Sequence, residues 1–168
     1  MGLAHSMLPE FDAEMASTRR LLEACPEARA SWKPHAKSSS LGDLALHLAS
    51  LIDWTNATLA STELDLAPPG GPAWTPPKFV SMQATLAMFD VKVAAARKAL
   101  AAASDAELGV LWSLKVGGNT LFTMPRSACL RSFVMNHLIH HRGQLSVYLR
   151  LIDVPVPQVY GPTADFGM

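Results

Sequence analysis

The chain has 168 residues, a length typical of one domain with its own hydrophobic core, and we treat residues 1–168 as a single domain. Fourteen Lys and Arg residues balance fourteen Asp and Glu residues, and charged residues make up 17% of the sequence. This neutral composition argues against nucleic acid as a partner, because phosphate binding normally requires an excess of basic residues. The apolar fraction of 49% is too high for a disordered chain.

The sequence indicates a cytoplasmic protein with no membrane partner. Its first residues, MGLAHSMLPEF, lack the basic and apolar stretches of a secretory signal peptide. No run approaches the roughly 18 uncharged apolar residues that are needed to cross a bilayer. The two cysteines, Cys25 and Cys129, lie far apart in the sequence, which is typical of ordinary thiols in a reducing compartment.

Four segments carry apolar residues at alternating steps of three and four, the period of a helix that buries one stripe. The first is expected over residues 9–24, with a proline in its first turn and another proline just beyond its end. The second is expected over residues 41–61. It follows Ser40, which has with Asp43 the spacing of a helix N-terminal capping pair.

The third and fourth segments extend the helical pattern over most of the chain. The third runs through residues 79–100, an unbroken seam in an alanine-rich stretch. The fourth follows Pro125 and reaches Ile152, where a Val-Pro-Val-Pro run prevents it from continuing. Because each helix has one apolar stripe, the simplest packing buries the four stripes against one another. We therefore predict an all-α four-helix bundle.

Two connections are too long for simple turns between helices. Residues 65–77 contain Pro68-Pro69-Gly70-Gly71-Pro72 and are expected to form a stiff crossover on the surface. Residues 111–123 bracket Gly117-Gly118-Asn119, so we predict a small hairpin-like insertion between the third and fourth helices.

Three of the six histidines, His137, His140 and His141, lie together on the fourth helix. At about 100° per residue, His137 and His141 are about 40° apart and lie within the apolar arc, whereas His140 lies at its edge. An unpaired imidazole in an apolar interior costs about 1 to 3 kcal/mol, and a metal ion bound by the pair would remove that cost. The pair is thus a candidate chelate for one divalent ion. The alternative is a pair of core histidines, each hydrogen-bonded to a carbonyl or a carboxylate.

His47 is a third candidate ligand, on the shoulder of the apolar stripe of the second helix. The histidine pair differs from that of the usual metalloprotease helix, in which a Glu follows the first His and acts as the base. Leu138 holds that position, so peptide hydrolysis by that mechanism lacks its base.

No general acid or base, and no cofactor-contacting residue, stands out from the sequence. Asp43 lies one turn before His47 and either orients its imidazole or caps the helix, and we favour the cap. Helical geometry places Trp54, Tyr148 and Arg142 near the histidines. We expect core packing for the two aromatic residues and a solvent-facing position for Arg142. Both cysteines are interpreted as packing residues.

Several motifs of the chain resemble the DinB family of metal-dependent bundle proteins. They include the histidine in the middle of the second helix, the run NHLIHHRGQL at residues 136–145 and the ending VPVPQVYGPTAD at residues 154–165. The stretches WKPH at residues 32–35 and LFTMPR at residues 121–126 also fit. The resemblance extends over nearly the whole chain.

The resemblance implies a four-helix bundle in an up-down-down-up order, usually assembled as a homodimer. It also implies a divalent ion such as zinc or nickel held by three histidines. Carried over by position, these metal ligands are His47, His137 and His141. The family name refers to induction by DNA damage and implies no binding of DNA.

Relatives in that family include transferases and isomerases that use low-molecular-weight thiols, and the resemblance therefore suggests a reaction class. Three imidazoles leave a bound ion with an open position, as in catalytic zinc sites, and a thiol bound there would be a nucleophilic thiolate. We expect a metal-dependent, thiol-dependent S-transferase that acts on a small molecule. Its pocket should lie between the second and fourth helices, beneath Trp74 and the Gly117-Gly118 turn. The alternative is a non-catalytic, stress-associated protein in which the ion only staples the bundle.

Overall fold

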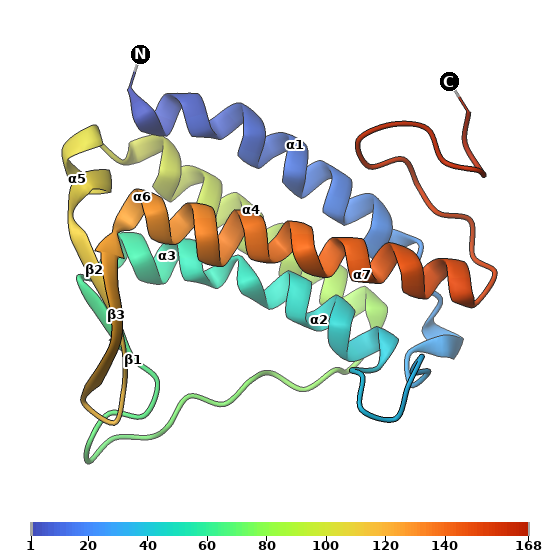
Figure 1. Ribbon diagram of the computed structural model, residues 1–168, viewed down its shortest axis with the longest axis horizontal. Coiled ribbons are helices and arrows are strands. Elements are labelled where there is room, and N and C mark those ends of the chain that lie inside the picture. The colour runs from blue at the N-terminus through green and yellow to red at the C-terminus, as the bar shows by residue number, and fades with distance from the viewer. Residues whose placement is uncertain (1, 168) are drawn as a thin grey trace.

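Four long helical segments lie side by side in the computed structural model, which describes residues 2–167 (Figure 1). The segments are α1 (Leu3–Glu23), α2 with α3 (Leu41–Leu51 and Asp53–Ala60), α4 (Met82–Ala102), and α6 with η2 and α7 (Arg126–Cys129, Leu130–Asn136 and His137–Leu151). Two short elements, η1 (Glu27–Arg29) and α5 (Asp105–Gly109), follow α1 and α4. In Figure 1, α1 and α7 run in one direction and α2, α3 and α4 in the other. The chain is thus mostly helical, and within residues 2–167 no helix is long and apolar enough to span a membrane.

A three-stranded sheet lies at one end of the helices, so the chain is not strictly all-α (Figure 1). Strands β2 (Leu111–Val116) and β3 (Asn119–Pro125) form the expected hairpin. Its turn residues, Gly117 and Gly118, have φ values of 61° and 78°, which favour glycine. Strand β1 (Glu63–Asp65) leads into the crossover and pairs in parallel with β2. The sequence did not indicate this third strand, because three residues are too few to show alternation.

Helix α1 begins at Leu3 rather than at Pro9, which lies inside the helix. The carboxylate of Asp105, in α5, accepts a hydrogen bond from the backbone N–H of Leu3 at 2.5 Å. A carboxylate at a helix N-terminus satisfies a donor that the helix itself cannot, and it also favours the positive end of the helix dipole. The predicted start was wrong because this cap comes from a residue far away in the sequence.

The predicted second helix is divided into α2 and α3 by a break at Ile52. Its start agrees with the sequence pattern, since the hydroxyl of Ser40 accepts a hydrogen bond from the N–H of Asp43 at 3.1 Å. The Asp43 carboxylate in turn accepts a hydrogen bond from that hydroxyl at 2.7 Å. Asp43 therefore belongs to the N-terminal cap of α2, as we expected, and not to the surroundings of His47.

The fourth helical segment contains a stretch of π-helix, η2, directly before His137. In a π-helix each N–H bonds to the carbonyl five residues earlier, so each residue turns the chain by less than in an α-helix. At the two histidines the buried stripe of α7 is consequently displaced by one residue, from His137 and His141 to Leu138 and Arg142. It consists of Leu138, Arg142, Leu145 and Leu149. His137 and His141 lie beside this stripe and are only half-buried, which corrects the expectation that both point into the core.

The contact between Asp105 and Leu3 predicts the effect of removing the cap of α1. Asp105→Ala should lower the free energy of unfolding by about 1 kcal/mol, because a backbone donor loses its acceptor. Asp105→Asn retains an oxygen acceptor and should cost less. Urea denaturation followed by circular dichroism measures both variants. An alanine variant as stable as the wild type would show that this contact does not stabilise α1.

Candidate metal centre

The side chains of His47, His137 and His141 converge in the space between α2 and α7. The Nε2 atom of His137 lies 3.5 Å from that of His47 and 2.9 Å from that of His141. A tetrahedral ion with metal–nitrogen bonds of about 2.0–2.1 Å would hold two nitrogens roughly 3.3 Å apart. The spacing of the three imidazoles therefore fits a single divalent ion after only small side-chain adjustments.

The three histidines meet because α2 and α7 pack against each other through the hydrophobic core. His137 and His141 are four residues apart, so they lie on successive turns of one face of α7. His47 approaches them from the middle of α2, on the edge of a helix whose other residues are mostly buried. His140 is exposed and lies outside the cluster, as its position at the edge of the apolar arc predicted.

Burial keeps the three imidazoles in their neutral form near pH 7. Desolvation, followed by the charges of the two neighbouring imidazoles, lowers the pKa of His47 to about 4. Desolvation is also the main reason why the pKa values of His137 and His141 are lowered. Because metal ions bind the neutral imidazole, all three side chains are ready to act as ligands at neutral pH.

Hydrogen bonds orient two of the three imidazole rings, those of His141 and His137. The Nδ1 atom of His141 lies 2.7 Å from Oε1 of Gln144, and the side chain of His137 bonds to the backbone of Phe133. An imidazole that donates a proton to such an acceptor presents the opposite nitrogen as a free ligand. Gln144 was not among the residues expected to act at the site. Its position three residues after His141, on the same helix face, is the signal that could have identified it.

A pocket of about 370 Å³ opens beside the histidines. Its lining residues are Ser38, Ser39, Leu44, His47, His141, Gln144 and Tyr148. The pocket lies between the start of α2 and the exposed side of α7, as expected for a pocket between the second and fourth helices. Trp74 and the Gly117-Gly118 turn do not line it, so that part of the expectation was wrong. Trp74 instead lines a separate pocket with residues of α3 and Lys92 of α4. The reason is that the proline-rich crossover covers the seam between α3 and α4 rather than the seam between α2 and α7.

The three residues expected near the histidines have different roles. Tyr148 lines the pocket, and its hydroxyl donates a hydrogen bond to the carbonyl of Ser39 at 3.3 Å. Trp54 packs against Phe133, with ring centroids 6.3 Å apart, and this stack lies between α3 and η2. Arg142 is buried in an ion pair with Glu14, so the expected solvent-facing position was wrong.

Neither cysteine contributes to the histidine cluster. Cys25 and Cys129 are free and buried, as expected of packing residues. Burial raises the pKa of Cys25 to about 12 and also raises the pKa of Cys129. Within residues 2–167, no thiol or carboxylate joins the three imidazoles as a fourth candidate ligand. An ion held there would have three protein ligands, the number typical of catalytic rather than closed structural zinc sites.

Comparisons with known proteins relate nearly the whole chain to one family. The DinB family model matches residues 3–167. The crystal structure of a DinB-like protein from Bacillus cereus ATCC 10987 is 24% identical, with a TM-score of 0.72, and the match covers 93% of this chain and 97% of that one. A DinB-like protein from Bacillus subtilis is 19% identical, with a TM-score of 0.69, and the match covers 92% and 97% of the two chains. Comparison with curated proteins found no match.

The contact between Gln144 and His141 predicts which ring nitrogen carries the proton. In the metal-free protein, His141 should be protonated on Nδ1, because Oε1 of Gln144 accepts from that nitrogen. Gln144→Leu should shift the tautomer equilibrium toward the form protonated on Nε2, whereas Gln144→Glu, which keeps an acceptor, should preserve it. Imidazole nitrogen chemical shifts measured by NMR report the tautomer. An unchanged tautomer in the leucine variant would contradict this role.

The low pKa of His47 predicts how the stability of the metal-free protein depends on pH. The folded-state pKa of about 4 lies below the value of about 6.5 in the unfolded chain, so the unfolded chain binds more protons between these values. The free energy of unfolding should therefore fall as the pH decreases from about 6.5 toward 4. Urea midpoints at pH 7 and pH 5 measure this loss. The loss should be smaller in His47→Leu, and an equal loss would contradict the assignment to His47.

Proposed function

The chain belongs to the DinB family, and from this premise we propose that it binds one divalent metal ion through His47, His137 and His141. We further propose that it is a thiol-dependent S-transferase acting on a small electrophile. The observation that carries the proposal is the convergence of three neutral imidazoles beside a pocket, with no fourth candidate ligand within residues 2–167. Such a site leaves a bound ion accessible to an exogenous molecule.

The donor set suits zinc or nickel, since imidazole nitrogens favour both ions. When bound, such an ion would lower the pKa of a coordinated thiol and so supply a thiolate at neutral pH. The chain's own part is to hold and orient the three imidazoles. Gln144 and the backbone of Phe133 fix two of the rings.

The reacting thiol must come from outside the chain. Cys25 and Cys129 are buried, their pKa values are raised, and neither lies in the cluster. A low-molecular-weight thiol fits better, because a pocket of about 370 Å³ is in the size range of small-molecule sites. In the proposed reaction the thiol loses its proton to solvent, and its sulfur forms a bond to an electrophilic carbon. The leaving group departs with the electron pair of the broken bond.

Metal content measured by mass spectrometry tests the site. The purified protein, after loading with zinc or nickel, should contain about one ion per chain. His47→Ala, His137→Ala and His141→Ala should each lose most of this ion, because each removes one of three ligands. His140→Ala is the matched control and should retain it, since His140 is exposed and outside the cluster. Circular dichroism verifies that every variant is folded.

The reaction is tested separately, on the loaded protein. Cobalt-substituted protein should develop a sulfur-to-metal absorption band when a small thiol is added, and the thiol should then be consumed with an aryl halide as the electrophile. No bound metal in the wild type would refute the whole proposal. The transferase proposal would be refuted if the ion binds tightly but addition of thiol and electrophile produces neither the absorption band nor thiol consumption. If removal of that ion also lowers the unfolding temperature, its role is structural.

A further inference from the structure

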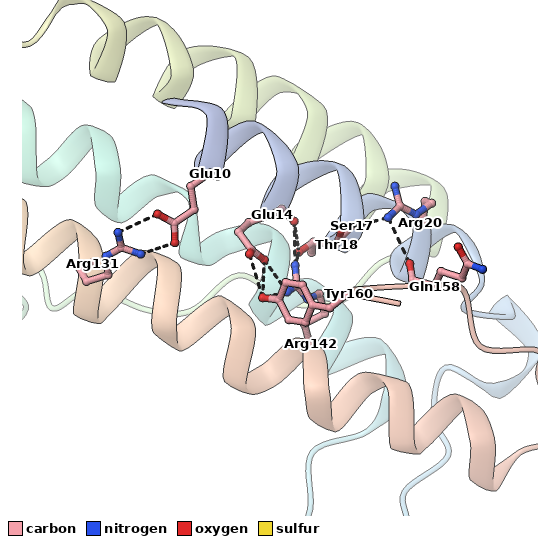
Figure 2. A network of polar contacts seen from close by, with 9 residues as sticks. All are labelled: Glu10, Glu14, Ser17, Thr18, Arg20, Arg131, Arg142, Gln158 and Tyr160. Atoms are coloured by element: carbon pink, nitrogen blue, oxygen red, sulfur yellow. Dashed lines mark hydrogen bonds and ion pairs between the residues drawn. The ribbon is translucent and has the colours of Figure 1, made fainter. Parts of the chain in front are cut away.

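A buried cluster of charged and polar side chains lies on the side of α7 that faces α1 (Figure 2). Arg142, the residue after His141, is only 1% exposed, and Glu14 of α1 is 7% exposed. The Arg142 Nη2 atom pairs with the Glu14 carboxylate at 2.5 Å, and Nη1 donates to the main-chain carbonyl of Glu14 at 3.1 Å. One side chain of α7 therefore binds both the carboxylate and the backbone of the neighbouring helix.

Tyr160, in the segment that follows α7, completes this cluster (Figure 2). Its hydroxyl donates to the two carboxylate oxygens of Glu14, at 2.9 and 3.0 Å, and accepts from Nη2 of Arg142 at 2.5 Å. The guanidinium carbon lies 4.9 Å from the centroid of the tyrosine ring, within the range of a cation–π contact. Tyr160 is nevertheless 71% exposed. Its contacts with Arg142 and Glu14, rather than burial in the core, hold it in place.

Further polar contacts attach the C-terminal segment to both helices. Asp165 pairs with Arg150 of α7, at 3.1 Å between Nη1 and Oδ1, and accepts a hydrogen bond from the N–H of Val156 at 2.8 Å. On the other side, Arg20 of α1 donates to the carbonyl of Gln158 at 3.2 Å (Figure 2). The segment thus forms a bridge between the end of α1 and the end of α7, with Tyr160 inserted between the bridge and the buried ion pair.

We propose that Arg142 and Tyr160 are positioning residues for the metal centre, and that the C-terminal segment thereby sets the metal affinity. This inference rests on the proposed function, because it requires an ion at the three histidines. His141 and Arg142 are consecutive residues of one helical turn, so the contacts that hold the guanidinium also hold that turn against rotation about the axis of α7. Such rotation would move the Nε2 atom of His141 away from that of His137, 2.9 Å distant.

The π-helical stretch explains why α7 needs to be held at this point. Its hydrogen bonds follow a different pattern from those of the α-helix on either side, and η2 ends directly before His137. The turn that carries the histidines therefore lies next to the place where the helix can change its twist. Arg142 is the first buried polar contact after this place that joins α7 to α1.

Two conservative variants test the hydroxyl of Tyr160 and the guanidinium of Arg142 separately. Tyr160→Phe keeps the ring and removes only the hydroxyl that bonds to Glu14 and Arg142. Arg142→Lys keeps the charge but loses the planar fork that binds two groups at once. Arg131→Lys is the matched control. Arg131 joins the same two helical segments through a bidentate pair with Glu10, but this pair is exposed to solvent (Figure 2).

The dissociation constant for zinc, measured by competition with a chelator, tests the proposal under conditions in which each variant is fully folded. Tyr160→Phe should bind zinc about tenfold more weakly, and Arg142→Lys at least as weakly. Loss of a group bonded directly to a metal ligand costs about 10- to 100-fold in affinity, and these two residues act on His141 through the helix, so the low end of that range is expected. Arg131→Lys should remain within about twofold of the wild type. The visible absorption spectrum of the cobalt-substituted Tyr160→Phe protein should also differ, because the ligand geometry changes.

A purely structural role of the cluster would give a different result. The urea midpoint would fall in both variants, while the zinc affinity of the folded protein and the cobalt spectrum stayed unchanged, and that result would overturn the proposal. If Arg142→Lys does not fold, Tyr160→Phe decides the question by itself. Zinc binding in the wild type with unaffected variants refutes only the positioning role, whereas a wild type that binds no metal refutes the proposed function and this inference with it.

Discussion

The packing of α2 against α7 determines whether the three histidines can act together, because His47 and the histidine pair come from different helices. Leu48, Leu138 and Leu145 are fully buried in the core that joins these helices. Burying a leucine side chain stabilises the fold by about 1.5 to 3 kcal/mol. This apolar contact offsets the unfavourable desolvation of three neighbouring imidazoles, whose cost is visible in their lowered pKa values.

Apolar periodicity and local capping signals predicted the four helical segments and the cap at Ser40, and the glycine-rich turn predicted the hairpin. They also placed His137 and His141 on one face of a helix. His47 lay only on the shoulder of its stripe, and its assignment as a ligand came from the family resemblance. Two features were missed because they depend on residues far apart in the sequence: the cap of α1 by Asp105, and the pairing of the short strand β1 with β2.

The burial of Arg142 could not be predicted from a regular helical wheel. Arginine is rarely buried, so a surface position was the reasonable expectation, but the π-helical stretch turns this residue into the core. A signal was nevertheless present in α1, where Glu14 lies between the apolar residues Phe11 and Met15. A carboxylate on a buried helix face requires a cationic or hydrogen-bonding partner. In this fold the partner lies 128 residues away.

The π-helical stretch also has a genetic consequence. A π-turn accommodates one residue more than an α-turn, so a chain shorter by a single codon between residues 130 and 136 would form a continuous α-helix. The lost residue and the lost π-turn would compensate each other, and the histidine pair and Arg142 would keep their present faces. If a chain of unchanged length formed a continuous α-helix instead, every later residue would be rotated by about 100°. The histidine pair would then face the apolar core, and Arg142 would leave Glu14. The number of residues in this stretch must therefore match its hydrogen-bonding pattern for the helix to present its histidines to the pocket.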